Sequence, residues 1–266
     1  MIDLTHLSLV FHAGTMHAVT ALQDVSLHLE AGEFVTVIGS NGAGKSTLLN
    51  SIAGVYPLQQ GQIVIAGRDV THWTEHQRAR FIGRVFQNPV DGTAASMSIE
   101  QNLALAHARG RALRLRPGVT RARRALFRQA LATLGMGLEQ RLTLGVHRLS
   151  GGQRQALTLL MATLTRPQIL LLDEHTAALD PVAAAHIMQL TQRLVQEQQL
   201  TTLMVTHNMQ QALAYGDRTL MLHRGQCILD IRGAPRQGLT VQDLIKQFTE
   251  ARREAVVDDA LLLGDH

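Results

Sequence analysis

The sequence lacks the features that mark disulfide-stabilised, membrane-spanning and exported proteins. Only one of its 266 residues is a cysteine, Cys227, which excludes an intramolecular disulfide bond and a zinc site made of cysteines. No apolar run approaches the roughly 18 to 20 residues that a membrane-spanning helix needs, and the strongly apolar stretch Ile169–Leu172 leads directly into two acidic residues. The opening residues, Met1-Ile2-Asp3, lack the basic and then apolar pattern of a signal peptide. We therefore expect a cytosolic protein.

Aromatic residues are scarce as well, since they make up 3% of the chain while 45% of its residues are hydrophobic. The core must therefore be aliphatic, which suits a parallel sheet covered by helices better than a β-sandwich. The length allows one α/β domain that carries an inserted subdomain. Charged residues account for only 17% of the chain, which is low for a surface wholly exposed to water and makes part of that surface a candidate partner interface.

One segment lacks acidic residues, because none occurs between Glu100 and Glu139, where arginine is frequent. Two interpretations are open: a face that meets anionic lipid headgroups or nucleic acid, or an ordinary solvated helical surface. Only one aromatic residue, Phe127, is interleaved with the arginines, which argues against nucleic-acid binding, so no nucleic-acid partner is expected. The arginines are Arg109, Arg111, Arg114, Arg116, Arg121, Arg123, Arg124 and Arg128.

The order of apolar segments predicts an α/β fold. Strand patterns at Leu4–Phe11 and Val25–Leu29 precede a β-branched apolar segment, Phe34–Ile38, a glycine-rich loop at 39–44 and a helix at Lys45–Ala53. Because strands and helices alternate, we predict a mostly parallel sheet with right-handed crossovers. Further strands are expected at Ile63–Ile65, Gly83–Phe86, Ile169–Leu172, Thr202–Thr206 and Arg218–Leu222, with a short polar helix at Glu75–Arg80.

Helical patterns rich in alanine, leucine and arginine dominate from about residue 88 to 160, with a break at Pro117-Gly118. We therefore predict a helical subdomain at about 88–160, inserted in a nucleotide-binding domain that covers residues 1–240. The remaining residues, 241–266, are expected to form a short amphipathic helix, Val241–Arg252, and a tail.

The segment from Gly39 to Thr47 fits the pattern G-x-x-x-x-G-K-[ST] of a phosphate-binding loop. It follows a predicted strand and opens a predicted helix, which is the context that the motif requires. Its glycines let backbone N–H groups converge on phosphate oxygens, and the helix N-terminus adds its positive dipole end. Lys45 is expected to contact the β- and γ-phosphates of ATP, and the Ser46 hydroxyl to bind Mg²⁺. The loop consists of Gly39, Ser40, Asn41, Gly42, Ala43, Gly44, Lys45, Ser46 and Thr47.

Two carboxylates, Asp173 and Glu174, stand at the end of the apolar strand Ile169–Leu172. Ligands of open α/β sheets bind at the carboxyl ends of the strands. Asp173 is suited to hold Mg²⁺ through a water, and Glu174 to activate the attacking water as general base. An acidic pair after a strand is also a common helix cap, so the prediction depends on the phosphate loop.

The segment Leu149-Ser150-Gly151-Gly152-Gln153 is weak as a signal by itself, because serine and glycine are ordinary cap and turn residues. It precedes a predicted helix, Arg154–Leu164, whose N-terminus is suited to a second anion. Together with the phosphate loop and the acidic pair, it resembles the signature of the ATP-binding cassette (ABC) ATPase family. The resemblance implies that Ser150, Gly151, Gly152 and Gln153 lie against the γ-phosphate held by a second copy of the chain, so that two copies close around two ATP molecules.

The same resemblance implies roles for four further residues. Gln87 matches the glutamine that contacts Mg²⁺ and the attacking water, although taken alone it reads as a loop residue. His207 matches the histidine that contacts the γ-phosphate, and Asp180 belongs to a loop that reaches the partner's site. Phe11 is placed to stack on adenine, with a core role as the alternative. The implied fold is a P-loop NTPase core with a mostly parallel sheet, an antiparallel β subdomain and an inserted α-helical subdomain.

One residue departs from the family pattern. Many members have proline after the catalytic glutamate, whereas this chain has His175. Loss of a proline is expected to loosen the backbone slightly without removing a catalytic group, so hydrolysis should be retained.

Several stretches resemble more narrowly the ATPases of bacterial importers of the tryptophan/tyrosine type. The resemblance implies a motor at the cytoplasmic face of the plasma membrane, which drives permease subunits that receive solute from an extracytoplasmic binding protein. The solute does not touch this subunit, so these stretches indicate kinship rather than specificity. They are Gln87–Ala94, Leu159–Thr163, Asp173–Asp180 and Thr201–Met209.

Two alternatives stay open from the sequence. An exporter motor with a separate membrane subunit would carry the same motifs. A soluble ABC ATPase of DNA repair, translation or cluster assembly is the other alternative. Translation types usually carry two cassettes in one chain, and repair types carry zinc modules or long coiled coils inside the cassette. Neither pattern is found in this sequence.

Overall fold

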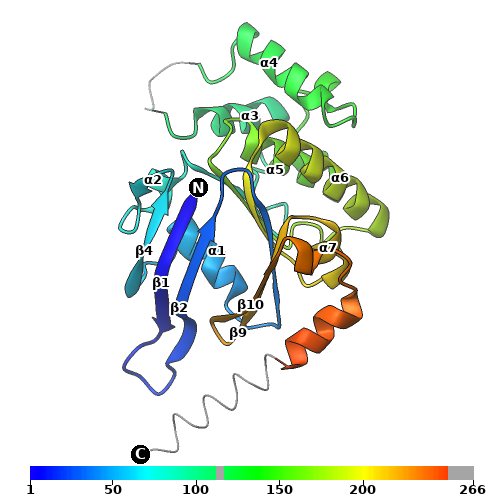
Figure 1. The fold of residues 1–266 in the computed structure, drawn as a ribbon. Coiled ribbons are helices and arrows are strands. Elements are labelled where there is room, and N and C mark those ends of the chain that lie inside the picture. The colour runs from blue at the N-terminus through cyan, green and yellow to red at the C-terminus, as the bar shows by residue number, and fades with distance from the viewer. Residues whose placement is uncertain (112–116, 251–266) are drawn as a thin grey trace, which may run out of the picture. The chain divides into compact units, whose positions relative to one another are not determined.

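The structure is a computed structural model that describes residues 1–111 and 117–250 (Figure 1). Arg114 and Arg116 of the basic segment lie outside the described residues, as do the end of the predicted helix Val241–Arg252 and the tail after it. The chain divides into two compact units, one made of Met1–His72 with the described part of Leu203–His266, the other of Trp73–Thr202. The helical segment predicted at about 88–160 falls within the second unit.

An antiparallel sheet in the order β2-β1-β4-β5 belongs to the first unit. Apolar residues alternate along β1, so one face of the sheet is buried: Leu4 lies opposite Leu27 of β2 and Ile63 of β4, and all three are buried. Its strands are β1 (Ile2–Phe11), β2 (Val19–Leu29), β4 (Gln60–Ile65) and β5 (Arg68–Asp69).

The first unit also contains β3 (Phe34–Gly39), which pairs in parallel with β9 (Arg218–His223). Strand β10 (Gln226–Arg232) is antiparallel to β9, and β8 (Thr201–Val205), which spans the boundary between the units, follows β3 in the strand order. Helix α1 (Lys45–Ala53) continues the chain after β3.

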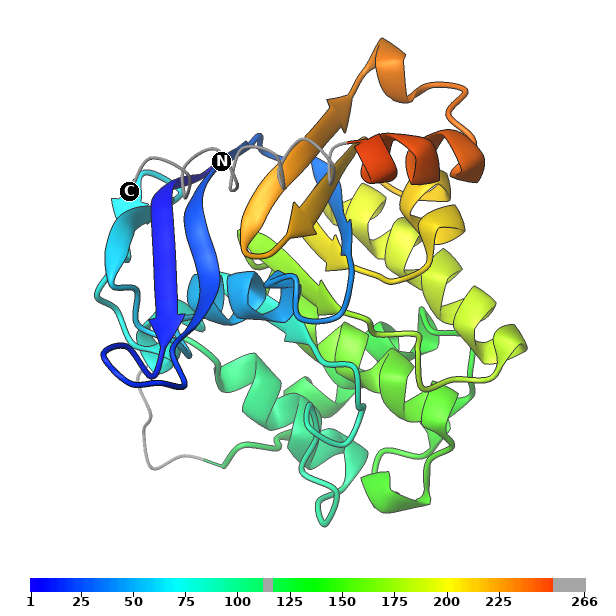
Figure 2. The ribbon, with the colours of Figure 1, turned by 90° about the horizontal axis from the view of Figure 1, so that it is seen from below.

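Helix α7 (Met209–Ala214) and the helix formed by residues 241–250 pack on the sheet of the first unit (Figure 2). The buried residues at this contact are aliphatic, as the low aromatic content predicts, and Phe248 packs against them as a partly buried residue. The buried cluster that joins these elements is Ile38, Ala212, Met221, Ile231 and Leu244.

The second unit pairs β6 (Ile82–Val85) in parallel with β7 (Ile169–Asp173). A Cβ on Gly83 would lie 2.5 Å from the carbonyl oxygen of Ala162, so glycine allows the helix α5 to approach β6 closely. Helices α5 and α6 lie side by side (Figure 1). The helices of this unit are α2 (Glu75–Arg78), α3 (Ile99–Ala108), α4 (Arg121–Ala132), α5 (Gly151–Thr163) and α6 (Pro181–Gln198).

The predicted α/β class is confirmed, and α1 has the predicted bounds. Strand β2 was predicted to start at Val25 but begins at Val19, because its first residues pair with Val10 and Phe11 of β1. Strand β10 was not predicted. Its residues are mostly half-buried, so they lack the clean alternation by which edge strands are recognised. No helix among the described residues is long and apolar enough to cross a bilayer.

Candidate functional site

The phosphate loop joins β3 to α1 and depends on glycine for its shape. Gly39, Gly42 and Gly44 have φ angles of 151°, 77° and 98°, which residues with side chains rarely adopt. A Cβ on Gly39 would lie 2.3 Å from the carbonyl oxygen of Leu222, and one on Gly44 would lie 2.4 Å from that of Ala21. Neighbouring backbone therefore excludes any larger residue at these two positions.

Lys45 lies back across this loop. Its Nζ donates hydrogen bonds to the carbonyl oxygens of Gly39 at 2.9 Å and Ser40 at 3.0 Å, and its side chain is buried. No side chain of the described chain caps α1 at Gly44. A helix N-terminus without such a cap, next to an ammonium group, is suited to bind a phosphate.

The loop that carries His207 lies near the end of β3. The N–H of Thr206 donates to the carbonyl oxygen of Val37 at 3.1 Å. The Thr206 hydroxyl accepts from the Asn208 N–H at 3.0 Å, and the Asn208 side chain accepts from the N–H of Gln211 at the start of α7. These bonds fix the backbone on either side of His207, whose side chain is exposed. The first unit thus brings His207 to the same end of β3 as the phosphate loop.

The two predicted carboxylates lie in the second unit, at the end of β7. Residues Ile169–Leu172 are fully buried, whereas Asp173 and Glu174 are partly exposed. Glu174 has a φ of 43°, in the left-handed region. A residue with a side chain adopts that conformation at a cost of about 1–3 kcal/mol, and such residues concentrate at functional sites.

The absence of proline at position 175 led us to expect a slightly looser backbone. The structure instead shows His175 held by hydrogen bonds to its main chain and its side chain. Its side chain is 2% exposed, and burial lowers its pKa to about 4, so the imidazole is neutral at pH 7. Its Nε2 lies 3.1 Å from the hydroxyl oxygen of Thr191 in α6, and that hydroxyl donates its own proton to the carbonyl oxygen of Ile187 at 2.8 Å. The imidazole must therefore carry its proton on Nε2 and donate it to Thr191. A proline could not make this bond.

Gln155 in α5 was not predicted as a functional residue. It is fully buried, and its Nε2 donates to the carbonyl oxygen of His175 at 2.6 Å and to that of Phe86 at 3.3 Å. The first acceptor follows Glu174 in the chain, and the second precedes Gln87. The sequence did hold one sign of its role: Gln155 is a polar residue on the same helix face as the apolar Leu159.

The signature segment caps α5. The N–H of Gln153 donates to the Ser150 hydroxyl at 3.2 Å, and the Gln153 side chain accepts from the Ser150 N–H at 3.2 Å. This is a capping box. Ser150 and Gly151 are exposed, so the first turn of α5 faces outward. The role of this segment as a helix cap is compatible with its predicted role in nucleotide binding, because both roles use the N-terminus of α5.

The loop after β6 contains Gln87, whose side chain is exposed. The loop is held on α3 by Asn102, another residue that the sequence did not single out. The Asn102 amide accepts from the Ala94 N–H at 2.8 Å and donates to the carbonyl oxygens of Ala94 and Ser98, each at 3.0 Å. A buried asparagine thus fixes the loop to its neighbouring helix.

Phe11 and Asp180 make contacts that also serve the fold. Phe11 is partly exposed at the end of β1 and packs edge-on against Tyr56, with ring centroids 5.2 Å apart. The carboxylate of Asp180 accepts from the N–H groups of Val182 at 3.1 Å and Ala183 at 3.0 Å, which makes it the N-cap of α6. Their predicted roles in nucleotide contacts stay predictions.

The basic segment is partly structural. Arg124 donates to both oxygens of Glu100, at 2.7 and 2.9 Å, and these bonds lower the pKa of Glu100. Arg109 donates to the carbonyl oxygen of Ala162 and to the Thr165 hydroxyl. These two arginines therefore join helices of the second unit.

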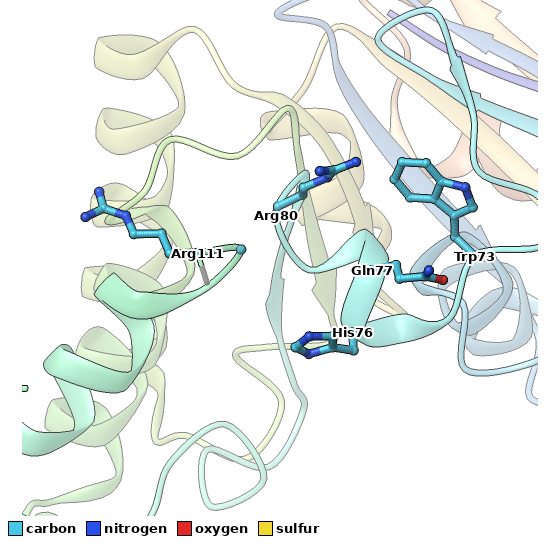
Figure 3. Close-up of a pocket in the computed structure, with 6 residues that line it drawn as sticks. Trp73, His76, Gln77, Arg80 and Arg111 are labelled. Atoms are coloured by element: carbon cyan, nitrogen blue, oxygen red, sulfur yellow. The ribbon is translucent and has the colours of Figure 1, made fainter. Parts of the chain in front are cut away.

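A pocket of about 350 Å³ also lies in the second unit (Figure 3). The Arg80 guanidinium lies 4.8 Å from the ring centroid of Trp73 and 4.7 Å from that of Phe81. In Figure 3 the Arg111 side chain points away from Trp73. None of the residues predicted to hold nucleotide lines it. The lining residues are Trp73, His76, Gln77, Arg80, Gly110 and Arg111.

A family model described as "ABC transporter" matches residues 22–177, more than half of the chain. The chain belongs to the ABC transporter family. The resemblance stated from the motifs is thereby confirmed, and with it the prediction of an ATP-hydrolysing transporter subunit.

Relatives with several transport functions match most of the chain. A tyrosine transport ATP-binding protein of Clostridioides difficile (strain R20291) is 42% identical over 94% of this chain and 100% of its own length. A sulfate/thiosulfate import ATP-binding protein of Nocardia farcinica (strain IFM 10152) is 38% identical over 77% of this chain and 59% of its own length. An energy-coupling factor transporter ATP-binding protein of Latilactobacillus sakei subsp. sakei (strain 23K) is 36% identical over 78% of this chain and 71% of its own length.

Two solved ABC structures share the fold. A dimeric post-hydrolysis state of the ATP-binding cassette MJ0796 bound to ADP and Pi has a TM-score of 0.73 at 27% identity, and the match covers 87% of this chain and 98% of that one. The ADP conformation of the cassette MJ1267 has a TM-score of 0.77 at 23% identity, over 94% of this chain and 98% of that one. The second comparison supports the fold alone, and both agree with the predicted P-loop NTPase architecture.

Proposed function

We propose that this chain is the ATP-hydrolysing motor of a bacterial importer for an aromatic amino acid of the tyrosine or tryptophan type. The observation that carries the proposal is the 42% identity to a tyrosine transport ATP-binding protein over that protein's whole length. Two copies of the chain close head-to-tail around two ATP molecules, in line with the dimeric cassette among the related structures. Closure moves two permease subunits, and hydrolysis reopens the dimer.

Each copy contributes residues of two kinds to the proposed sites. The phosphate loop holds the β- and γ-phosphates, with Lys45 supplying positive charge. Glu174 takes the proton of the attacking water, Gln87 orients that water, and His207 contacts the γ-phosphate. Phe11 stacks on the adenine. The second copy adds its signature residues, Ser150, Gly151, Gly152 and Gln153, and its Asp180.

Ser46, Gln87 and Asp173 are the proposed Mg²⁺ ligands. They offer a hydroxyl, an amide and a carboxylate oxygen, the hard donors that Mg²⁺ prefers. Ser46 and Gln87 are exposed and Asp173 is partly exposed, so solvent reaches all three. When bound, the ion neutralises charge on the β- and γ-phosphates.

Glu174→Gln tests the catalytic assignment. We expect the variant to bind ATP, to hydrolyse it slower by a factor of about 10² or more, and to accumulate as an ATP-bound dimer in size-exclusion chromatography. Lys45→Ala is the contrasting variant, since it should weaken nucleotide binding itself. Wild-type hydrolysis by Glu174→Gln would show that another group is the base.

The permease is proposed to dock on the loop between Gln87 and Ser98. Two apolar side chains of this loop are exposed, Val90 at 44% and Met97 at 38%, as expected of a surface that a partner covers. Val90→Ser and Met97→Ser should reduce transport in reconstituted vesicles while basal ATPase activity is kept. Leu126→Ser, on the exposed surface of α4 at 44%, is the control. Full transport by both loop variants would refute this docking site.

Co-purification from native membranes tests the direction of transport and the proposed place at the cytoplasmic face. We expect a polytopic membrane protein and an extracytoplasmic binding protein that binds tyrosine or tryptophan. A membrane protein alone would favour an exporter. Recovery only in the soluble fraction, without a membrane partner, would refute the transport role and leave the ATPase in place.

A further inference from the structure

One buried amide, that of Gln155, joins the segments of the second unit that carry Gln87 and Glu174. Gln155 of α5 holds the carbonyl oxygen of His175 at 2.6 Å and that of Phe86 at 3.3 Å. Both partners are acceptors, so the donor end of the amide must face them. Gln155 is fully buried in the helix that Ser150 caps. A displacement of α5 would therefore act on the backbone next to Glu174 and on the backbone next to Gln87.

A second buried hydrogen bond holds His175, this time through its side chain. The His175 imidazole donates through Nε2 to Thr191 at 3.1 Å, and the orientation of the Thr191 hydroxyl is set by its own bond to Ile187 at 2.8 Å. Helix α5 thus fixes the main chain of His175, and helix α6 fixes its side chain. Glu174, immediately before it, has the left-handed φ of 43°.

We propose that Gln155, His175 and Thr191 are positioning residues that hold the carboxylate of Glu174 in the orientation needed for water activation. The proposal rests on the proposed role of Glu174 as general base. A left-handed residue with a side chain keeps its conformation only where its surroundings determine it, and these two bonds hold His175, the residue that follows Glu174. All three residues are buried, so they act through Glu174 and not on ATP.

Thr191→Val is the sharpest test, because it keeps the volume of the side chain and removes the acceptor of the His175 proton. We expect kcat for ATP hydrolysis to fall about tenfold, since small displacements of a catalytic group have effects of this order, while KM for ATP stays within about twofold. Thr191→Ser keeps the hydroxyl and should restore kcat. Thr163→Val is the matched control: Thr163 is buried in α5, and among the described residues its hydroxyl bonds only to Leu159 and Leu160 of the same helix.

Gln155→Met gives a second measurement, because it removes the other bond to His175 at similar side-chain volume. The double variant with Thr191→Val should lose less activity than the product of the two single losses, since both bonds hold one residue. A kcat of Thr191→Val equal to that of Thr163→Val, or multiplicative losses in the double variant, would overturn the proposal while an inactive Glu174→Gln leaves the proposed function intact. Wild-type hydrolysis by Glu174→Gln would instead overturn the role of Glu174 and this inference with it.

Discussion

Arg218→Met should destabilise the first unit, because it removes the buried cation to which a group of acceptors is bonded. Arg218 is 5% exposed, and its guanidinium donates to both oxygens of Asp230, at 2.7 and 2.5 Å, and to the carbonyl oxygen of His28 at 2.6 Å. Glu33 lies 3.5 Å away. Hydrogen bonds to Asp230 raise the pKa of Arg218, so the group stays charged.

The size of the effect follows from what the substitution leaves behind. Removing one partner of a buried ion pair costs about 3–5 kcal/mol. The Asp230 side chain is 40% exposed and regains water, which places the expected loss at the lower end, about 3 kcal/mol. Globular proteins unfold with an entropy of about 2.1 cal/mol/K per residue, so a chain of 266 residues should lose about 5 °C in Tm.

Differential scanning calorimetry of the nucleotide-free protein measures this shift. Arg232→Met is the matched control, since Arg232 lies opposite Arg218 on β10 and is exposed, and its Tm should stay within about 1 °C because surface substitutions change stability by about 0.5 kcal/mol or less. Because β9 pairs with β3 along Val35–Gly39, the affinity for a fluorescent ATP analogue should fall as well. Equal Tm values for the two variants would refute the reasoning.

The remaining predictions concern the phosphate loop and the loss of folding stability at low pH. Gly39→Ala places a Cβ 2.3 Å from Leu222 backbone and should abolish nucleotide binding in equilibrium titration, whereas Gly118→Ala meets only Ala104 at 3.6 Å and should bind normally. Bonds from Arg124 lower the pKa of Glu100 from 4.5, so the pair stabilises the fold above that pH and the contribution is lost as pH falls through the lowered pKa. Urea unfolding of Glu100→Gln should therefore show a smaller loss of stability between pH 6 and pH 3 than the wild type, and an unchanged loss would exclude this pair as a source.

The sequence was sufficient for the phosphate loop because that motif is local. Its residues are consecutive, and its glycines are required by backbone conformation and by the approach of neighbouring strands. The same holds for α1, where predicted and observed bounds agree. Family membership followed from such local motifs, each of which keeps its spacing whatever the rest of the chain does.

Tertiary structure decided which polar residues hold those motifs in place. Gln155 lies 20 residues from its partner His175 and 69 from Phe86, and Asn102 lies 8 residues from Ala94. No periodic pattern encodes bonds of this kind, because their partners are main-chain carbonyl and N–H groups that every sequence offers.

His175 shows the same division in one residue. The sequence determined that proline is absent at this position, and from that alone a looser backbone was expected. The fold instead buries His175, where the Thr191 hydroxyl of α6 holds its imidazole and the Gln155 amide of α5 holds its main-chain carbonyl. The chemistry of the catalytic groups is thus specified residue by residue in the sequence. The bonds that orient them form only when α5 packs against α6 and β6, because hydrogen bonds gain their geometry from packing.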